Sequence, residues 1–373
     1  MNKESFGYKT WKRLKRNRPA MLGAWFIVLS VLVAIGCYLA MPDATPNANR
    51  MMLEISARKP GFKMTFLKLD KPRVQQVPWY EGWFNGRPDQ YTYLPITGYQ
   101  LVGDTLIVQH FLDETTSDEQ RLALTEVVRN PAGIADMGQY IAKERIEKKT
   151  FVMGTDKYGR DMLSRLLLGT RISLSVGIIA VLISLTIGIL FGALAGYFGG
   201  WPDKIIMWLI NTIWAIPTLL LVFAITIALG KGFWQIFIAV GLTMWVGPAR
   251  LIRGQVMGIK ELGYIDAARA LGYNHLRIIF RHILPNIIGP VLVLAASNFA
   301  VAILIEAGLS FLGIGVQPPQ ASWGLMIKEN YNFIITDNPM LALIPGLAIM
   351  LMVLAFNLLA NGLRDAVDVR SVD

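Results

Sequence analysis

Long uninterrupted apolar runs constrain this chain more than any other feature of its sequence. A helix needs about 20 apolar residues to cross the roughly 30 Å hydrocarbon core of a bilayer. The 373-residue chain is 54% hydrophobic and 17% charged, which is more apolar length than one soluble core requires. We therefore predict a polytopic all-α membrane protein with six transmembrane helices. They lie near 22–41, 172–197, 205–229, 233–251, 287–313 and 340–360.

The first run follows a basic segment, and this position allows two other interpretations. A secretory signal usually has an apolar core of about 7–15 residues and then a small-x-small cleavage site, and none follows Ala40. The sequence AIGC, which ends at Cys37, is similar to a lipoprotein cleavage site, but the apolar run continues beyond it. We therefore interpret 22–41 as an uncleaved helix. The continuity of every run also disfavours the alternating strands of a membrane barrel.

The distribution of Lys and Arg predicts the orientation, because short cytoplasmic segments retain positive residues. The first 20 residues contain seven basic residues and one acidic residue, and 250–286 contains six and two. We predict that both termini and the 250–286 loop are cytoplasmic. The net charge of +10 then reflects the membrane topology. We expect the basic residues to lie near anionic membrane lipid, and we expect no nucleic acid partner.

With that topology, residues 42–165 form an extracytoplasmic segment that is too long for a simple loop. The stretches 50–70 and 91–111 contain short β-prone runs, while 117–130 and 136–149 have the pattern of amphipathic helices. We expect a small mixed α/β insertion between the first two transmembrane helices. The chain has one cysteine, so no disulfide can stabilise it, and we expect it to dock on the membrane part.

The sequence shows no signature of catalysis or of a resident metal. The three histidines, His110, His275 and His282, lack metal-ligand spacing. There is no phosphate-binding loop, nucleophile elbow or zinc-protease motif. We expect no catalytic, cofactor or metal site in this chain. Active transport would then draw energy from an ion gradient or from another polypeptide.

Glu306 is the exception to a nearly uncharged set of predicted spans. A charge inside a membrane is costly and is usually kept for function. Glu306 lies towards the outer end of the fifth predicted helix, where it either reaches the interface or a helix partner, or takes part in a substrate path or gate. The scarcity of such residues favours energy supplied by a partner over an ion-coupled carrier.

Small residues and prolines predict close packing and bends among the helices. Small residues at every fourth position allow helix backbones to approach closely in lipid. In the second helix these positions are Ser184, Gly188, Gly192 and Gly196. Prolines interrupt helical hydrogen bonding and are expected to produce kinks or bends. They are Pro217, Pro248, Pro290 and Pro345.

The stretch 264–286, YIDAARALGYNHLRIIFRHILPN, is a basic segment between two long apolar runs. We predict a short helix that ends at Gly272, followed by a second helix with an apolar stripe at Leu276, Ile279, Phe280 and Ile283. The paired alanines at 267 and 268 would present a low surface to another protein. An amphipathic helix that rests on the membrane remains the alternative.

This stretch resembles the cytoplasmic loop of permease subunits of ATP-binding-cassette (ABC) importers. That loop has the pattern Glu-Ala-Ala, three residues, Gly, nine residues, Ile, one residue, Leu-Pro. The matching positions are Asp266, Ala267, Ala268, Gly272, Leu284 and Pro285. Asp266 departs from the pattern by one methylene, which changes the reach of any salt bridge to the ATPase. His282 stands in place of Ile, as is familiar in the peptide branch of the family.

Within the family the chain is similar to the second permease of the dipeptide, oligopeptide and nickel group. The similarity runs through 154–177, 195–203, 267–286, 306–324 and 364–370. The segment 42–150 has no counterpart in this pattern and is an insertion of unknown purpose. In GTDKYGRD (154–161) we interpret Asp161 as a helix cap, because the spacing does not match a calcium loop. A binding-protein contact is the alternative for 154–161, and the outer loop 315–324 is expected to be a plug or gate surface.

The resemblance implies the type I ABC importer permease fold in a bacterial or archaeal cytoplasmic membrane. Its partners would be a second homologous permease, two ATP-binding subunits or domains that hold ATP and Mg, and an extracytoplasmic solute-binding protein. Asp266, Ala267, Ala268 and Gly272 would couple the ATPase to transport. The substrate would be a di- or oligopeptide, with nickel or another small solute as the alternative. A membrane-anchored receptor and an ion-coupled carrier are the alternatives of a different class.

These arguments divide the chain into five parts. They are a cytoplasmic N-terminus (1–21), a first transmembrane helix (22–41), an extracytoplasmic insertion with the segment before the second helix (42–165), a permease core (166–361) that contains the coupling loop (252–286), and a cytoplasmic C-terminus (362–373).

Overall fold

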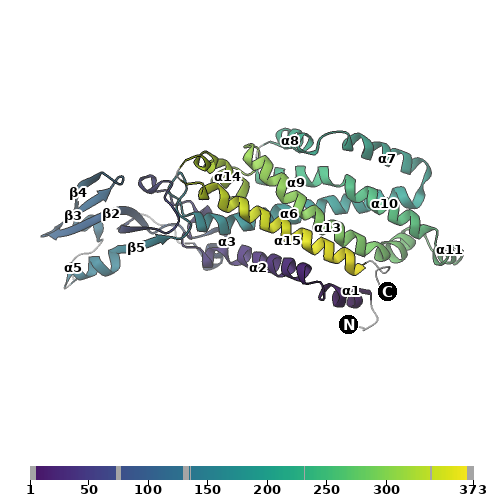
Figure 1. Ribbon diagram of the computed structural model, residues 1–373, viewed down its shortest axis with the longest axis horizontal. Helices are drawn as coiled ribbons and strands as arrows, with labels where there is room; N and C mark the ends of the chain where they lie inside the picture. The colour runs from purple at the N-terminus through teal and green to yellow at the C-terminus, as the bar shows by residue number, and fades with distance from the viewer. Residues whose placement is uncertain are drawn as a thin grey trace.

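A helical bundle with a β-sheet projecting from one end makes up the elongated molecule (Figure 1). The computed structural model describes residues 6–72, 77–128, 134, 136–230, 232–336 and 338–367. The first five residues of the predicted N-terminus and residues 368–373 of the predicted C-terminus lie outside this range. The helix α1 (Phe6–Leu14) and the last turn of α15 (Met340–Val367) lie at the end of the bundle opposite the sheet (Figure 1).

Five helical segments among the described residues are long and apolar enough to cross a membrane, which confirms five of the predicted helices. They are α2 (Arg18–Ala40), α6 (Met162–Phe198), the pair α9 (Phe233–Met244) and α10 (Val246–Lys260), α13 (Ile288–Phe311) with the turns before it from His275, and α15 (Met340–Val367). A helix suits a membrane span because it satisfies most of its backbone polar groups internally.

The helix predicted over 205–229 is sharply bent, at one of the prolines that were expected to produce a bend. The chain forms α7 (Gly200–Trp214) and α8 (Thr218–Leu229), which are bent by 94° and count as a sixth span only when taken together. The break falls at Pro217, which lacks an N–H and disfavours helical geometry in the residue before it. A proline in the middle of the apolar run therefore converts one span into two segments.

The other prolines act less uniformly than expected. Pro248 and Pro290 each stand in the first turn of a helix, α10 and α13, where a missing N–H costs nothing. Pro345 lies inside α15, which continues through it to Val367. The expectation that Pro345 interrupts its helix is therefore wrong.

The insertion contains an antiparallel five-stranded sheet, which confirms a mixed α/β segment. The strands are β1 (Phe62–Asp70), β2 (Tyr91–Val102), β3 (Thr105–Phe111), β4 (Ser117–Ala123) and β5 (Ile146–Phe151), in the order β4-β3-β2-β1-β5. The helices of the insertion are short: α3 (Trp79–Asn85), α4 (Leu124–Val127), α5 (Met137–Tyr140), the π-turn Ile141–Arg145, and the 3-10 turns Pro46–Ala48 and Leu53–Ile55.

The two helices predicted in the insertion are confirmed only in part, because α4 lies within 117–130 and α5 with the π-turn occupies 137–145 of 136–149. The first half of 117–130 is β4, which pairs with β3 over its whole length, and residues 129–130 lie outside the described part of the chain. The last part of 136–149 begins β5, which pairs with β1. Strand pairing satisfies the backbone in both places, and this tertiary effect outweighs the local helical pattern.

The insertion has its own core and also docks on the membrane helices. Leu67, Ile96, Leu106 and Val108 pack together with α4 and the π-turn. Docking contacts include a hydrogen bond from the Asp43 N–H to Ser164 Oγ (2.9 Å) and one from Asn338 Nδ2 to the Ala57 carbonyl (3.1 Å). The sheet therefore depends on both sources of stability rather than on docking alone.

Candidate functional site

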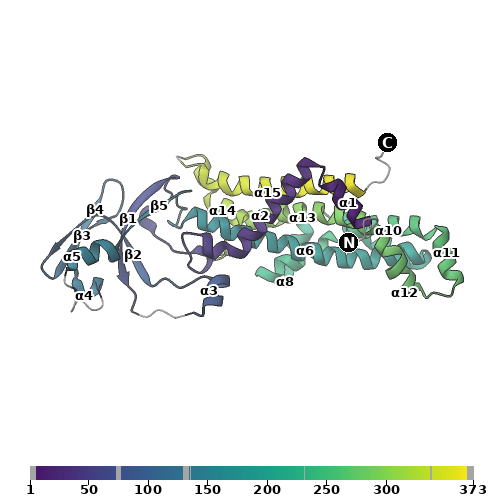
Figure 2. The ribbon, with the colours of Figure 1, turned by 90° about the horizontal axis from the view of Figure 1, so that it is seen from below.

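The end of the bundle opposite the sheet carries the predicted coupling loop. Residues 261–287, which we call the tip, form α11 (Gly263–Ala270), α12 (His275–Ile278), the π-turn Ile279–Ile283 and the 3-10 turn Leu284–Ile287. In both views α11 lies beyond the end of the long helices (Figures 1 and 2). The inward side chains of the whole tip form one core with α6 and α10, and this core attaches the tip to the bundle. They are Ile265, Ala268, Ile278, Ile279 and Ile283, packed with Tyr197 and Val256.

Gly272 ends α11 in the way its sequence position predicts. Its φ of +78° lies in the left-handed region that favours glycine. The N–H of Tyr273 donates to the Ala268 carbonyl (3.2 Å) and the N–H of Gly272 to the Arg269 carbonyl (2.9 Å), which is a Schellman cap. No other atom lies within 4 Å of a Cβ built on Gly272, so this corner of the tip is open.

The remaining loop positions divide between the inside and the outside of the tip. Asp266 is exposed and its Oδ1 accepts a hydrogen bond from Arg269 Nη1 at 2.9 Å, a surface pair that a stronger partner can displace. Ala267 and Pro285 are exposed, and Leu284 is half-buried against the tip core. Ala268 is only 4% exposed, so the expected surface of two adjacent alanines is reduced to one.

The expected apolar stripe of the second helix is split between two faces. Ile279 and Ile283 point into the core, because the π-turn that contains them packs against α10. Leu276 and Phe280 point outward and are 63% and 65% exposed, as is Leu271 at 72%. The tip therefore presents an apolar surface to the surroundings, and Arg277 and Arg281 are exposed on the same segment.

The small-residue stripe of α6 lies against α10. A Cβ on Gly192 would lie 2.5 Å from the Ala249 carbonyl oxygen, and one on Gly196 would lie 2.7 Å from that of Arg253. Gly188 meets Pro248, and Ser184 is fully buried and donates to the Val181 carbonyl at 3.1 Å. The three glycines therefore set how closely the two helices approach, and Ser184 is the buried residue one turn before them on α6.

We expect Gly192→Leu to separate α6 from α10 and to lower the thermal stability of the purified protein. Overpacking of a close contact typically costs about 1–3 kcal/mol. Gly254→Leu is the matched control, because it adds the same side chain to α10 where no atom lies within 4 Å of a built Cβ. Equal melting temperatures for the two variants would contradict the packing role of the stripe.

Glu306 lies fully buried between α13 and α6. Its carboxylate accepts hydrogen bonds from Ser310 Oγ (2.7 Å) and from Ser173 Oγ of α6 (3.4 Å). Ser310 Oγ also accepts from the N–H of Val316 (3.0 Å) and so connects Glu306 to the following loop. Glu306 is thus placed as a helix partner, and a role in gating stays a prediction.

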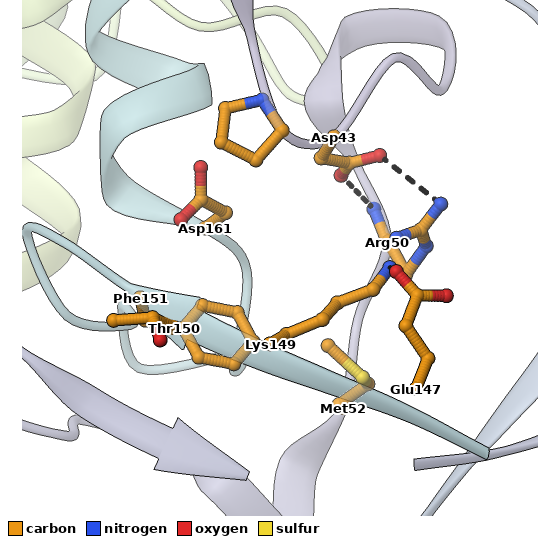
Figure 3. Close-up of a pocket in the computed structure, with 9 residues that line it drawn as sticks. Asp43, Arg50, Met52, Glu147, Lys149, Thr150, Phe151 and Asp161 are labelled. Atoms are coloured by element: carbon orange, nitrogen blue, oxygen red, sulfur yellow. Dashed lines mark hydrogen bonds and ion pairs between the residues drawn. The ribbon is translucent and has the colours of Figure 1, made fainter. Parts of the chain in front are cut away.

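At the sheet end, a cavity of about 270 Å³ lies between the insertion and the start of α6 (Figure 3). Asp161 caps α6 as expected, because its carboxylate accepts from the Ser164 N–H at 2.8 Å, and burial raises the pKa of Asp161. Desolvation lowers the pKa of Lys149, which extends from β5. Arg50 pairs with Asp43 at 3.7 Å and with Asp89. The charged groups of this cavity are therefore largely paired with one another.

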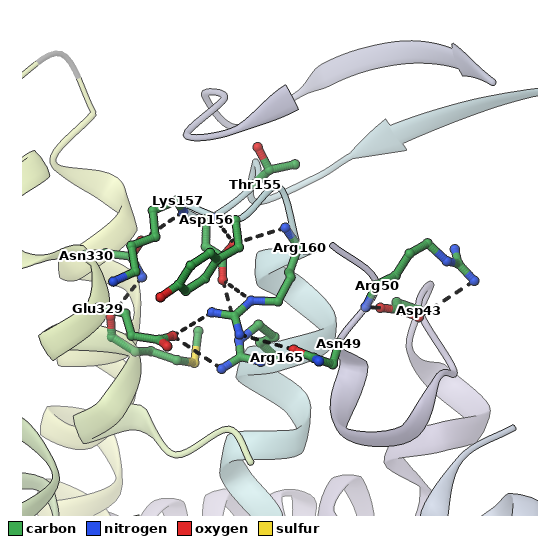
Figure 4. A network of polar contacts seen from close by, with 12 residues as sticks. Asp43, Asn49, Arg50, Thr155, Asp156, Lys157, Arg160, Arg165, Glu329 and Asn330 are labelled. Carbon is green, nitrogen blue, oxygen red and sulfur yellow. Dashed lines mark hydrogen bonds and ion pairs between the residues drawn. The ribbon is translucent and has the colours of Figure 1, made fainter. Parts of the chain in front are cut away.

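A buried ion cluster joins the start of α6 to α14 (Trp323–Asn330) (Figure 4). The 3-10 turn Tyr331–Ile334 follows α14. Arg160 bonds to Asp156 Oδ2 through Nε and to Glu329 Oε2 through Nη2, both at 2.6 Å. Arg165 lies 3.4 Å from Glu329 and 3.7 Å from Asp156. All four side chains are at most 6% exposed. The Asp156 carboxylate thus forms ion pairs with Arg160 and Arg165. The sequence did not predict that Glu329 would pair with the same two arginines.

Comparison with known proteins gives matches at both ends of the chain. The family of binding-protein-dependent transport system inner membrane components matches residues 188–372, and the N-terminal transmembrane domain of oligopeptide transport permease C matches 5–53. Residues 54–187, which include the sheet, lie outside both matches.

Similar curated proteins are transport permeases. The glutathione transport permease GsiD of Pectobacterium atrosepticum is 44% identical over 216 residues, which cover 58% of this chain and 71% of that protein. The dipeptide transport permease DppC of Bacillus subtilis is 41% identical over 215 residues, 58% of this chain and 67% of that protein. A solved inward-facing MetNI methionine ABC transporter aligns with 56% of this chain and 98% of its own, with 18% identity and a TM-score of 0.43. The family match and the curated relatives show that the chain belongs to the inner-membrane permeases of binding-protein-dependent ABC importers.

Proposed function

We propose that this chain is the second permease subunit of an ATP-driven importer of di- or oligopeptides and forms half of its translocation pathway. Relatives named for dipeptide, oligopeptide and glutathione transport support a peptide substrate, because glutathione is itself a small peptide. The alternative substrate is nickel or another small solute.

The observation that carries the coupling proposal is the exposed surface of the tip. Leu271, Leu276 and Phe280 form an apolar surface outside the bundle, and such a patch marks an interaction site. Exposed arginines on the same segment offer directional donors to carboxylates. Coupling would place this surface in a groove of an ATPase subunit, with Asp266 paired to a basic residue there.

The attachment of the tip explains how force would reach the pathway. Ile265 and Ala268 pack in the same core as Tyr197 of α6 and Val256 of α10. Because packed cores resist continuous deformation, a push on the tip would move these helices as a body between two arrangements. ATP hydrolysis and Mg binding belong to the ATPase subunits, and this chain is the non-catalytic transport subunit.

The proposed orientation places the tip and both termini in the cytoplasm. Basic residues concentrate before α2 and around the tip, as the positive-inside rule requires. The sheet end would then face outward, where a solute-binding protein delivers substrate. A second homologous permease would complete the pathway across the membrane.

Affinity purification of this chain from its native membrane in mild detergent tests the assembly. We expect a second permease and ATP-binding subunits to co-purify, and we expect the complex in proteoliposomes to take up labelled dipeptide when ATP and the binding protein are present. Uptake of Ni²⁺ instead of peptide would overturn the proposal that the substrate is a peptide. Uptake by this chain alone, without ATPase subunits, would overturn the coupling proposal and favour a self-powered carrier.

A further inference from the structure

The short helix α3 exposes an unusual concentration of aromatic surface. Its sequence is WYEGWFN, and Trp79, Tyr80 and Phe84 are 71%, 51% and 54% exposed. Trp79 and Trp83 are four residues apart, as are Tyr80 and Phe84, so the aromatic side chains occupy two adjoining faces of the helix. A single exposed aromatic residue is ordinary, but a contiguous group marks an interaction surface.

Contacts to the membrane helices fix the depth of α3. Trp83 Nε1–H donates to the Ile35 carbonyl of α2 at 3.1 Å, and the Arg171 guanidinium of α6 donates to the Phe84 carbonyl and lies over its ring, 5.5 Å from the centroid. Ile35 stands five residues before the end of α2, or about 8 Å at 1.5 Å per residue. The aromatic helix therefore lies beside the last turns of a transmembrane helix, on the side of the molecule that carries the sheet (Figure 2).

The aromatic surface continues the exposed apolar surface of α2. Leu32, Ile35 and Leu39 of α2 are all more than half exposed, although they belong to a membrane span. In such a span this surface meets lipid, and Trp and Tyr are enriched where a lipid-facing surface reaches the headgroups. An indole or phenol ring places an apolar body in the acyl region and a polar group in the wet interface.

We propose that α3 inserts its aromatic side chains into the headgroup region of the outer leaflet. In this way α3 holds the five-stranded sheet of the insertion in a fixed orientation relative to the membrane. The occupant of this surface is lipid, because the surface is continuous with the lipid-facing side of α2 and lies at interfacial depth. A seven-residue helix is too short to be stable alone, so its contacts with α2, α6 and lipid maintain it. This role is independent of the transported solute.

Site-directed fluorescence tests the proposal in the assembly in which the full chain purifies. Cys37 is the only cysteine, so Cys37→Ser gives a background for single labels. A nitrobenzoxadiazole label at Tyr80→Cys is compared with one at Leu39→Cys on α2 and one at Asp118→Cys on β4, in vesicles that contain brominated-acyl phosphatidylcholine. We expect quenching at position 80 to approach that at 39 and to exceed that at 118 by about threefold or more.

The other outcomes overturn the proposal. A label at position 80 that is unaffected by brominated lipid and quenched by aqueous iodide would place α3 in water. A label that neither reagent reaches would mean that a protein partner covers α3. Because peptide uptake is a separate measurement, a failure of the lipid contact leaves the proposed transport function standing.

Discussion

Replacement of Gly272 by arginine is expected to abolish transport while the chain still inserts and folds. Any side chain at φ +78° carries a backbone strain of about 1–2 kcal/mol, too little to unfold a large bundle. The new side chain meets no atom of this chain within 4 Å and projects from the corner of the tip into the space proposed for the ATPase. We expect near-background peptide uptake and loss of co-purifying ATP-binding subunits, with an unchanged yield in the membrane.

The control for this variant is Gly103→Arg in the β2–β3 turn. Gly103 also has a positive φ, +58°, and open space around a built Cβ, but it belongs to the sheet. It should retain both uptake and ATPase subunits. Normal uptake by a fully assembled Gly272→Arg complex would remove the tip from the coupling mechanism.

Glu329→Gln is expected to cause a large loss of stability, because Glu329 is a buried carboxylate that pairs with two buried arginines. The change leaves the buried Arg160 and Arg165 with Asp156 as their one remaining carboxylate partner in the cluster. Breaking a buried ion pair by removing one partner typically costs about 3–5 kcal/mol, because an uncompensated charge stays buried. We expect a melting temperature several degrees lower, measured as the exposure of buried Cys37 to a thiol-reactive dye.

An exposed pair on the sheet provides the matched comparison. Glu119 bonds to Arg121 at 3.1 Å with both side chains more than half exposed, and such pairs contribute about 1 kcal/mol or less. Glu119→Gln should therefore leave the melting temperature almost unchanged. If Glu329→Gln were equally silent, the cluster would not hold α14 to α6.

The sequence predicted the membrane helices and the tip because both are encoded locally. Apolar length alone identifies a span, and Gly272 at the end of a short helix predicts its own left-handed cap. The local sequence does not distinguish Pro217, where the helix bends, from Pro345, where α15 continues without a break. The effect of a proline depends on whether neighbouring helices can satisfy the freed carbonyl.

Features that depend on distant parts of the chain were predicted less well. β4 exists because β3 offers it a partner, although its sequence is compatible with a helix. The partner of Arg160 at Glu329 is 169 residues away, and no local spacing indicates it. The inward position of Ala268 follows from the tip core, which the loop motif does not describe. Pairing and burial at long range are decided by tertiary packing rather than by local pattern.

The length of α6 has a mechanical consequence. Its 37 residues extend for about 55 Å at 1.5 Å per residue, well beyond the roughly 30 Å of hydrocarbon. One end is clamped by the arginine cluster, and the other reaches the tip, where Tyr197 Oη lies 2.9 Å from His275 Nδ1. If α6 moves as a rigid helix of this length, a tilt of about 5° about its clamped end displaces the other end by about 5 Å. In the proposed assembly, α6 would therefore link the tip, where the ATPase is proposed to act, to the sheet end, where substrate is proposed to arrive.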